Sequence, residues 1–226
     1  FYPTRLTSFV EVIPGPQTDA DVTGQVVELV RRLKVRPIVC QNVPGFLVNR
    51  LIPAFYIEGV IMLEEGHHTA TEIDGAVKGS LTHLGPLESC DMIGLDIVEK
   101  GNVEFPHIWR EGWLNPPLLH ALIEAGRLGA KGGAGFYRYD DGKPIDETAS
   151  LPVTARRHTV EPYGREEIID RLYYTMVVEA FRQLDLGVGS EQDIDDTLRE
   201  VLGFRVGPIQ GARQQGLEQV RERLTA

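Results

Sequence analysis

Two stretches of the sequence resemble each other, and this repetition constrains the fold more than any other feature. When Arg50 is placed on Arg171, Gly66 falls on Gly187 in the same register. Further identities follow, with one inserted residue after Asp195: Leu51 on Leu172, Glu58 on Glu179, Leu63 on Leu184, Ile73-Asp74 on Ile194-Asp195, Gly85-Pro86 on Gly207-Pro208, Gly94-Leu95 on Gly216-Leu217 and Val98 on Val220. So many matches favour a duplicated unit over chance.

The repeated unit has the pattern of helices. Residues 48–63 are apolar on nearly every side, which is typical of a buried helix, and Gly66 is expected to end that helix in the left-handed conformation. Thr71-Glu72 is expected to begin a second helix that buries Ile73, Ala76 and Val77. From residue 44 onward no stretch alternates over the length of a strand. We therefore predict an all-helical region, apart from the turn-rich residues 126–139.

The first 42 residues have a different pattern. Leu6 to Ile13 is apolar enough for a buried strand, and Arg36 to Cys40 resembles a second one. Between them, Thr18 or Asp19 can cap a helix with apolar positions at helical spacing: Val22, Val26, Leu29, Val30 and Leu33. One strand–helix–strand unit is too small to stand alone, and the chain begins at Phe1 without Met, so we expect a piece of a longer protein.

These patterns predict four segments. Residues 1–42 form the α/β segment, and residues 43–140 form the first helical unit. Residues 141–164 are polar and contain three prolines, which is typical of a linker. Residues 165–226 form the second helical unit, which is the degenerate copy.

Composition excludes several classes of function. The 226 residues carry a formal charge of −10 and no basic run, so we expect neither a nucleic-acid partner nor an anionic membrane surface. No apolar run reaches the roughly 18–20 residues that cross a bilayer. Cys40 and Cys90 lie fifty positions apart, which favours free thiols in a reducing compartment such as the cytoplasm. The six histidines show no HExxH or HxH spacing, so no metal site is assigned.

Glu11 and Asn49 are candidate catalytic residues. Glu11 is a carboxylate in an apolar strand, where it must either face solvent or hold a partner. Such a carboxylate can orient an imidazole and stabilise its cationic form. Asn49 lies at the start of the apolar helix, where a neutral amide can hold a carbonyl or hydroxyl, although it could equally be a cap or a buried core amide. Its counterpart in the second unit is Asp170.

Lys131 is a candidate cofactor contact. It lies in the sequence GAKGGAGFY, where four glycines in seven positions let backbone approach a ligand and the lysine offers a point charge. The sequence is not a GxxxxGK[ST] phosphate loop, and no strand leads into a GxGxxG motif. A structural turn and a cofactor contact are both open here.

Four blocks, taken in order, resemble the C-terminal region of the L-3-hydroxyacyl-CoA dehydrogenases. They are FYP running to VEVI at residues 1–13, VPGFLVNRL at 43–51, GPLE with DMIGLD at 85–96, and KGGAGFY at 131–137. Residues 165–226 resemble the degenerate second C-terminal domain of some members, including multifunctional fatty-acid oxidation proteins. The implied fold is mainly α: tandem helical domains of the 6-phosphogluconate dehydrogenase C-terminal type, after a remnant of a Rossmann-type domain.

The resemblance also implies a reaction and roles for the candidate residues. Such enzymes oxidise (3S)-3-hydroxyacyl-CoA to 3-ketoacyl-CoA with NAD, which binds mostly to an upstream domain, in fatty-acid β-oxidation or related metabolism. Glu11 matches the glutamate that pairs with a catalytic histidine, expected two positions before Phe1. Asn49 matches the asparagine that binds substrate, and Lys131 matches a lysine that contacts NAD. Tyr2 departs from the Asn common in the family.

Two other functions are compatible with the sequence, and the tandem copy also suggests how the helical units assemble. The chain could belong to a related NAD-dependent hydroxy-acid dehydrogenase with a non-CoA substrate, or it could be a non-catalytic helical dimerisation module. The presence of Glu11, Asn49 and Lys131 together argues against a pure scaffold. Single-copy members pair through the helical domain, so the tandem copy is expected to form a pseudo-dimer within one chain, and a homo-oligomer is compatible with this.

Overall fold

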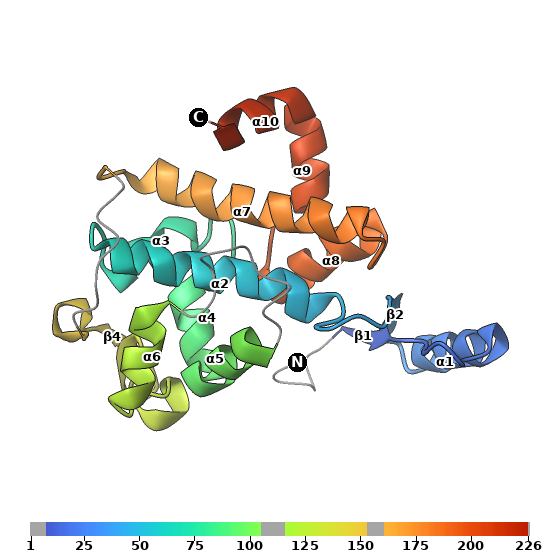
Figure 1. The fold of residues 1–226 in the computed structure, drawn as a ribbon, viewed down its shortest axis with the longest axis horizontal. Helices are drawn as coiled ribbons and strands as arrows, with labels where there is room; N and C mark the ends of the chain where they lie inside the picture. Colours follow the sequence, from blue (N-terminus) through green and yellow to red (C-terminus); the bar gives the residue numbers. More distant parts are fainter. Residues whose placement is uncertain (1–7, 105–115, 153–160, 226) are drawn as a thin grey trace. The chain divides into compact units, whose positions relative to one another are not determined.

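The computed structural model describes residues 8–104, 116–152 and 161–225 (Figure 1). It is mainly helical, as the sequence predicts. The chain forms two compact units: the first combines residues 1–52 with 177–226, and the second is Pro53–Met176. Predictions that concern Phe1 to Thr7, including Tyr2, lie outside the described residues, as do His107 and His158.

The first unit begins with the predicted strand–helix–strand segment. Strands β1 (Phe9–Val12) and β2 (Arg36–Val39) pair in parallel, and α1 (Ala20–Arg32) connects them and packs against both (Figure 1). Val30 is buried, but the other predicted apolar positions of α1 stay exposed, with 57% for Leu29. Helix α1 therefore forms with its apolar face largely uncovered within the described part of the chain.

Helix α2 (Val48–Glu65) confirms the predicted apolar helix, and its middle and end belong to the second unit. It ends at Gly66, whose φ of +77° is left-handed, as predicted. Helix α3 (Ala70–Val77) follows with a capping box: Thr69 Oγ1 accepts from the Glu72 amide, and the Glu72 carboxylate accepts from the Thr69 amide. The reciprocal bonds satisfy two orphan amides and fix the start of α3.

The rest of the second unit contains a hairpin that corrects the all-helical prediction. Three helices come first: α4 (Pro86–Ile93), α5 (Leu95–Glu104) and α6 (Pro117–Glu124). The short turn Ala130–Gly132 then leads to the antiparallel strands β3 (Tyr137–Asp140) and β4 (Lys143–Asp146), and a second short turn, Thr148–Ser150, follows them. Asp141 and Gly142 both have positive φ, as a tight hairpin turn requires. Asp-Gly is a strong hairpin signal, so residues 140–146 were predictable as strand and turn.

The last four helices are α7 (Arg165–Asp185), α8 (Glu191–Leu202), α9 (Pro208–Gln215) and α10 (Leu217–Thr225). They repeat a detail of α3 and α4. In the second unit, Asp74 accepts from the amides of Leu87 and Glu88 at 2.9 Å each. In the first unit, Asp195 accepts from the amides that begin α9, those of Ile209 and Gln210, also at 2.9 Å. The aligned aspartates thus cap aligned helices.

A second repeated detail joins α2 to α7 within each unit. In the first unit, Arg50 Nε donates to Gln183 Oε1 at 2.7 Å. Burial lowers the pKa of Arg50, and the negative charge of Glu179 acts in the opposite direction. In the second unit, Arg171 pairs with Glu58 at 2.5 Å and with Glu65 at 2.8 Å. Each aligned arginine is thus influenced by the aligned glutamate, Arg50 by the charge of Glu179 and Arg171 by its ion pair with Glu58.

Among the described residues, no helix combines the length and the apolar character needed to cross a membrane.

Candidate functional site

Glu11 binds the start of helix α2. Its Oε1 accepts from the backbone amides of Leu47 at 2.9 Å and of Val48 at 3.0 Å. The residue before helix α2 is Leu47, whose side chain has no polar atom that could cap the helix. The chain enters the helix through Gly45 and Phe46, both at positive φ. The carboxylate supplies the missing acceptor, and its charge is favourable at the positive end of the helix dipole.

Cys40 adds a third contact to the same carboxylate oxygen. It follows β2 directly and is buried, and its Sγ lies 3.9 Å from Glu11 Oε1. Burial and the neighbouring Glu11 charge raise the pKa of the thiol to about 12, so the sulfur keeps its proton and acts as a weak donor. Half-buried Glu11 thus has three partners that the sequence did not indicate: Leu47 just before α2, Val48 at its start, and Cys40 just after β2.

Asn49 follows the two residues that Glu11 binds. It is exposed on the first turn of α2, so the alternative of a buried core amide is wrong. The structure therefore brings two of the predicted site residues together at one place, where strand β1 meets the start of α2. Their catalytic roles remain predictions.

Lys131 belongs to the second unit and is exposed. The glycines around it have a structural reason: a Cβ at Gly129 would lie 2.5 Å from the Asp91 carbonyl oxygen, and a Cβ at Gly135 would lie 1.9 Å from Asp91 Oδ1. Fully buried Asp91 accepts from the amides of Phe136 and Tyr137 at 2.8 and 3.0 Å. The loop wraps this carboxylate, so the glycine pattern needs no ligand, and the NAD contact of Lys131 stays a prediction.

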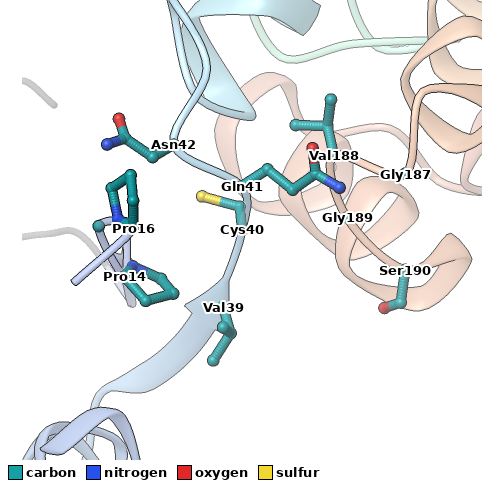
Figure 2. Close-up of a pocket in the computed structure, with 11 residues that line it drawn as sticks. Pro14, Pro16, Val39, Cys40, Gln41, Asn42, Gly187, Val188, Gly189 and Ser190 are labelled. Carbon is teal, nitrogen blue, oxygen red and sulfur yellow. The ribbon is translucent and has the colours of Figure 1, made fainter. Parts of the chain in front are cut away.

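A pocket of about 520 Å³ lies beside Cys40 in the first unit (Figure 2). The turns that follow β1 and β2 supply one side, with Pro14, Pro16 and Gln41, and the loop of residues 187–190 before α8 supplies the other. The Gln41 amide donates to the Val188 carbonyl at 3.1 Å, which ties the two sides together. This juxtaposition joins residues nearly 150 positions apart, and no sequence pattern indicated it.

The fold and the site together define a class of protein: a helical domain whose first long helix is capped by a carboxylate from a preceding α/β segment. Residues 45–139 and 168–224 match the family described as 3-hydroxyacyl-CoA dehydrogenase, C-terminal domain. These residues make up more than half of the chain, and the chain belongs to this family.

Individual relatives agree with the family. The chain is 29% identical to the peroxisomal bifunctional enzyme of Cavia porcellus over 99% of its own length and 34% of that protein. It is 36% identical to a probable 3-hydroxybutyryl-CoA dehydrogenase of Deinococcus radiodurans over 61% of the chain and 50% of that protein. A solved 3-hydroxybutyryl-CoA dehydrogenase of Escherichia coli K12 matches with a TM-score of 0.80 and 25% identity, over 100% of the chain and 64% of that structure. The chain thus spans about a third of the first of these relatives.

Proposed function

We propose that the complete protein containing this chain oxidises (3S)-3-hydroxyacyl-CoA to 3-ketoacyl-CoA with NAD, in fatty-acid or related acyl-CoA metabolism. The observation that carries the proposal is the junction of β1 with α2, where Glu11 is fixed beside the helix turn that presents Asn49. Relatives named as 3-hydroxybutyryl-CoA dehydrogenases support the substrate class.

Glu11 would act on a histidine base expected upstream of Phe1. Its Oε1 is occupied by the α2 amides, so the imidazole would approach Oε2. A carboxylate held this way fixes the imidazole orientation and stabilises the cation that forms when the base takes the hydroxyl proton. Asn49, exposed on the same turn, would donate its amide hydrogen to the substrate oxygen as that oxygen gains negative charge.

NAD would bind mostly outside this chain. The turn between β1 and α1 is Pro14-Gly15-Pro16 rather than a glycine-rich phosphate loop, so the pyrophosphate has no cradle there. Exposed Lys131 fits a peripheral contact with the phosphates. When bound, NAD accepts the hydride that leaves C3 of the substrate.

We also propose that residues 43–140 and 165–226 are two copies of one helical domain, with 1–42 the end of an NAD-binding domain. The paired helix caps of Asp74 and Asp195 support the duplication, as does the family match to two separate stretches. The aligned arginine contacts support a pseudo-dimer within the chain, and homo-oligomers remain compatible with it. Residues 141–164 would connect the copies, with β4 as an ordered part of the connection.

The two cysteines bear on the location of the protein. The free, buried thiols of Cys40 and Cys90 support a reducing compartment, and we propose the cytoplasm. Relatives named as peroxisomal make the peroxisome the alternative, and imaging of the tagged complete protein distinguishes the two.

The test compares substrates in the complete protein. With NAD, (3S)-3-hydroxybutyryl-CoA should be turned over with a kcat/KM at least about 100-fold above that for free 3-hydroxybutyrate, because binding of the CoA moiety is used to position the reacting carbon. Equal rates would favour the non-CoA dehydrogenase. No turnover of either compound, with the protein folded, would favour the dimerisation module.

A further inference from the structure

We propose that helix α8 of the second helical segment positions Glu11 by holding the β1–β2 pair through Arg36. This inference rests on the proposed function, and it assigns a catalytic task to a part of the chain that would otherwise serve only for pairing. All residues involved belong to the first compact unit.

Arg36 is the centre of the contact. Its guanidinium lies 3.3 Å from Asp193 and 2.9 Å from Glu200, which are seven residues apart and therefore on one face of α8. Ser8, just before β1, also donates a hydrogen bond to Glu200. All three charged side chains keep only 26–28% of their exposure, so solvent screens them less than an open surface pair.

The ends of the same strands are held by the loop before α8. Gln41 lies two residues beyond the end of β2, and its backbone amide donates to the Val188 carbonyl. A Cβ at Gly189 would lie 3.3 Å from the side chain of Leu47, whose amide binds Glu11. The absence of a side chain at Gly189 thus lets the loop approach the α2 turn closely.

Together these contacts hold the strand pair at both ends. Arg36 fixes the beginning of β2, which pairs with β1 so that Glu11 lies opposite Ile38. Gln41 fixes the chain just after Cys40, the third donor to Glu11. Loosening the Arg36 contact would let the strands shift while the α2 amides stay in place, and the Glu11 carboxylate would then lose its fixed orientation. Misplacement of a catalytic partner by a fraction of an ångström is enough to slow a reaction severalfold.

The experiment uses the complete protein with Arg36→Gln, and Glu200→Gln as a milder variant if the first does not fold. Arg32→Gln is the matched control, because Arg32 forms an exposed pair with Glu28 on α1. Each change is also made in a Glu11→Gln background. We expect Arg36→Gln to lower kcat about three- to tenfold with little change in KM, and to have no further effect once Glu11 is replaced, because a residue that acts through Glu11 cannot act without it.

A second readout does not depend on activity. Cys40 is buried beside Glu11, so its alkylation rate, measured by mass spectrometry, should rise severalfold in Arg36→Gln, while that of Cys90 should not. Equal kcat in Arg36→Gln and the control, or an equal loss in both backgrounds, would overturn the positioning role. If the wild-type protein lacks dehydrogenase activity, the proposed function fails. An unchanged alkylation rate of Cys40 in Arg36→Gln would independently refute the inference that the contact with α8 holds the strands in place.

Discussion

Replacing Glu11 by Gln and by Ala should separate its structural task from its catalytic task. Oε1 accepts from two backbone amides at the start of α2. Gln keeps an acceptor oxygen in that place but has no charge. Ala removes the acceptor and leaves the amides of buried Leu47 and Val48 without it. From the usual cost of a lost helix cap and an unsatisfied donor, Glu11→Ala should lower the free energy of unfolding by about 2–3 kcal/mol, and Glu11→Gln by less than about 1 kcal/mol.

The catalytic result should differ from the stability result. Both variants remove the negative charge that orients the base, so both should lower kcat by about 10²–10⁴. The assays are urea unfolding followed by circular dichroism and NADH absorbance with a 3-hydroxyacyl-CoA, both on the complete protein. Equal destabilisation by Gln and Ala would contradict the capping task of Glu11, and a Glu11→Gln kcat within a few-fold of wild type would contradict its catalytic task.

Four further substitutions test other residues. Asn49→Ala should reduce kcat/KM by about 1.5–4 kcal/mol of transition-state binding, whereas Asp170→Ala at the aligned position should change it only a few-fold; equal losses at matched stability would contradict unequal copies. Lys131→Ala should raise the KM for NAD a few-fold and leave kcat nearly unchanged, and an unchanged KM would make the lysine structural. Burial raises the pKa of Asp74 from its usual 3.8 to about 6. Between those two pH values the folded state therefore binds more protons than the unfolded state. The free energy of unfolding should fall as the pH rises from about 4 to about 6, by up to about 3 kcal/mol. In Asp74→Asn that pH dependence should be smaller in urea unfolding between about pH 4 and about pH 6.5, and an unchanged slope would refute the assignment.

Local patterns predicted the parts of the fold that local physics determines. The helix at residues 48–65 follows from its apolar sequence, and its end follows from Gly66, because both signals lie within the segment itself. The hairpin was equally local, since Asp141-Gly142 is a strong turn signal, but its strands are only four residues each, and the second one does not alternate. Short strands are therefore easily taken for coil.

The candidate site was predictable only in part, because its contacts join distant residues. The sequence indicated that Glu11 needed a partner, and it marked the helix start at residues 44–49. Nothing in either pattern indicated that the amides of Leu47 and Val48 would be that partner. The absence of a local capping side chain before α2 was the one available signal, since an uncapped helix start needs an acceptor from elsewhere.

In the proposed function, this chain supplies one half of a hydroxyacyl-CoA dehydrogenase site whose other half lies upstream. The most direct measurement is NADH oxidation with acetoacetyl-CoA, made on the complete protein and on the isolated 226-residue chain. We expect turnover by the complete protein and none by the isolated chain, because its β1–α1–β2 unit has Pro14-Gly15-Pro16 in place of a glycine-rich phosphate loop. Turnover by the isolated chain, or a folded complete protein without turnover, would contradict the account.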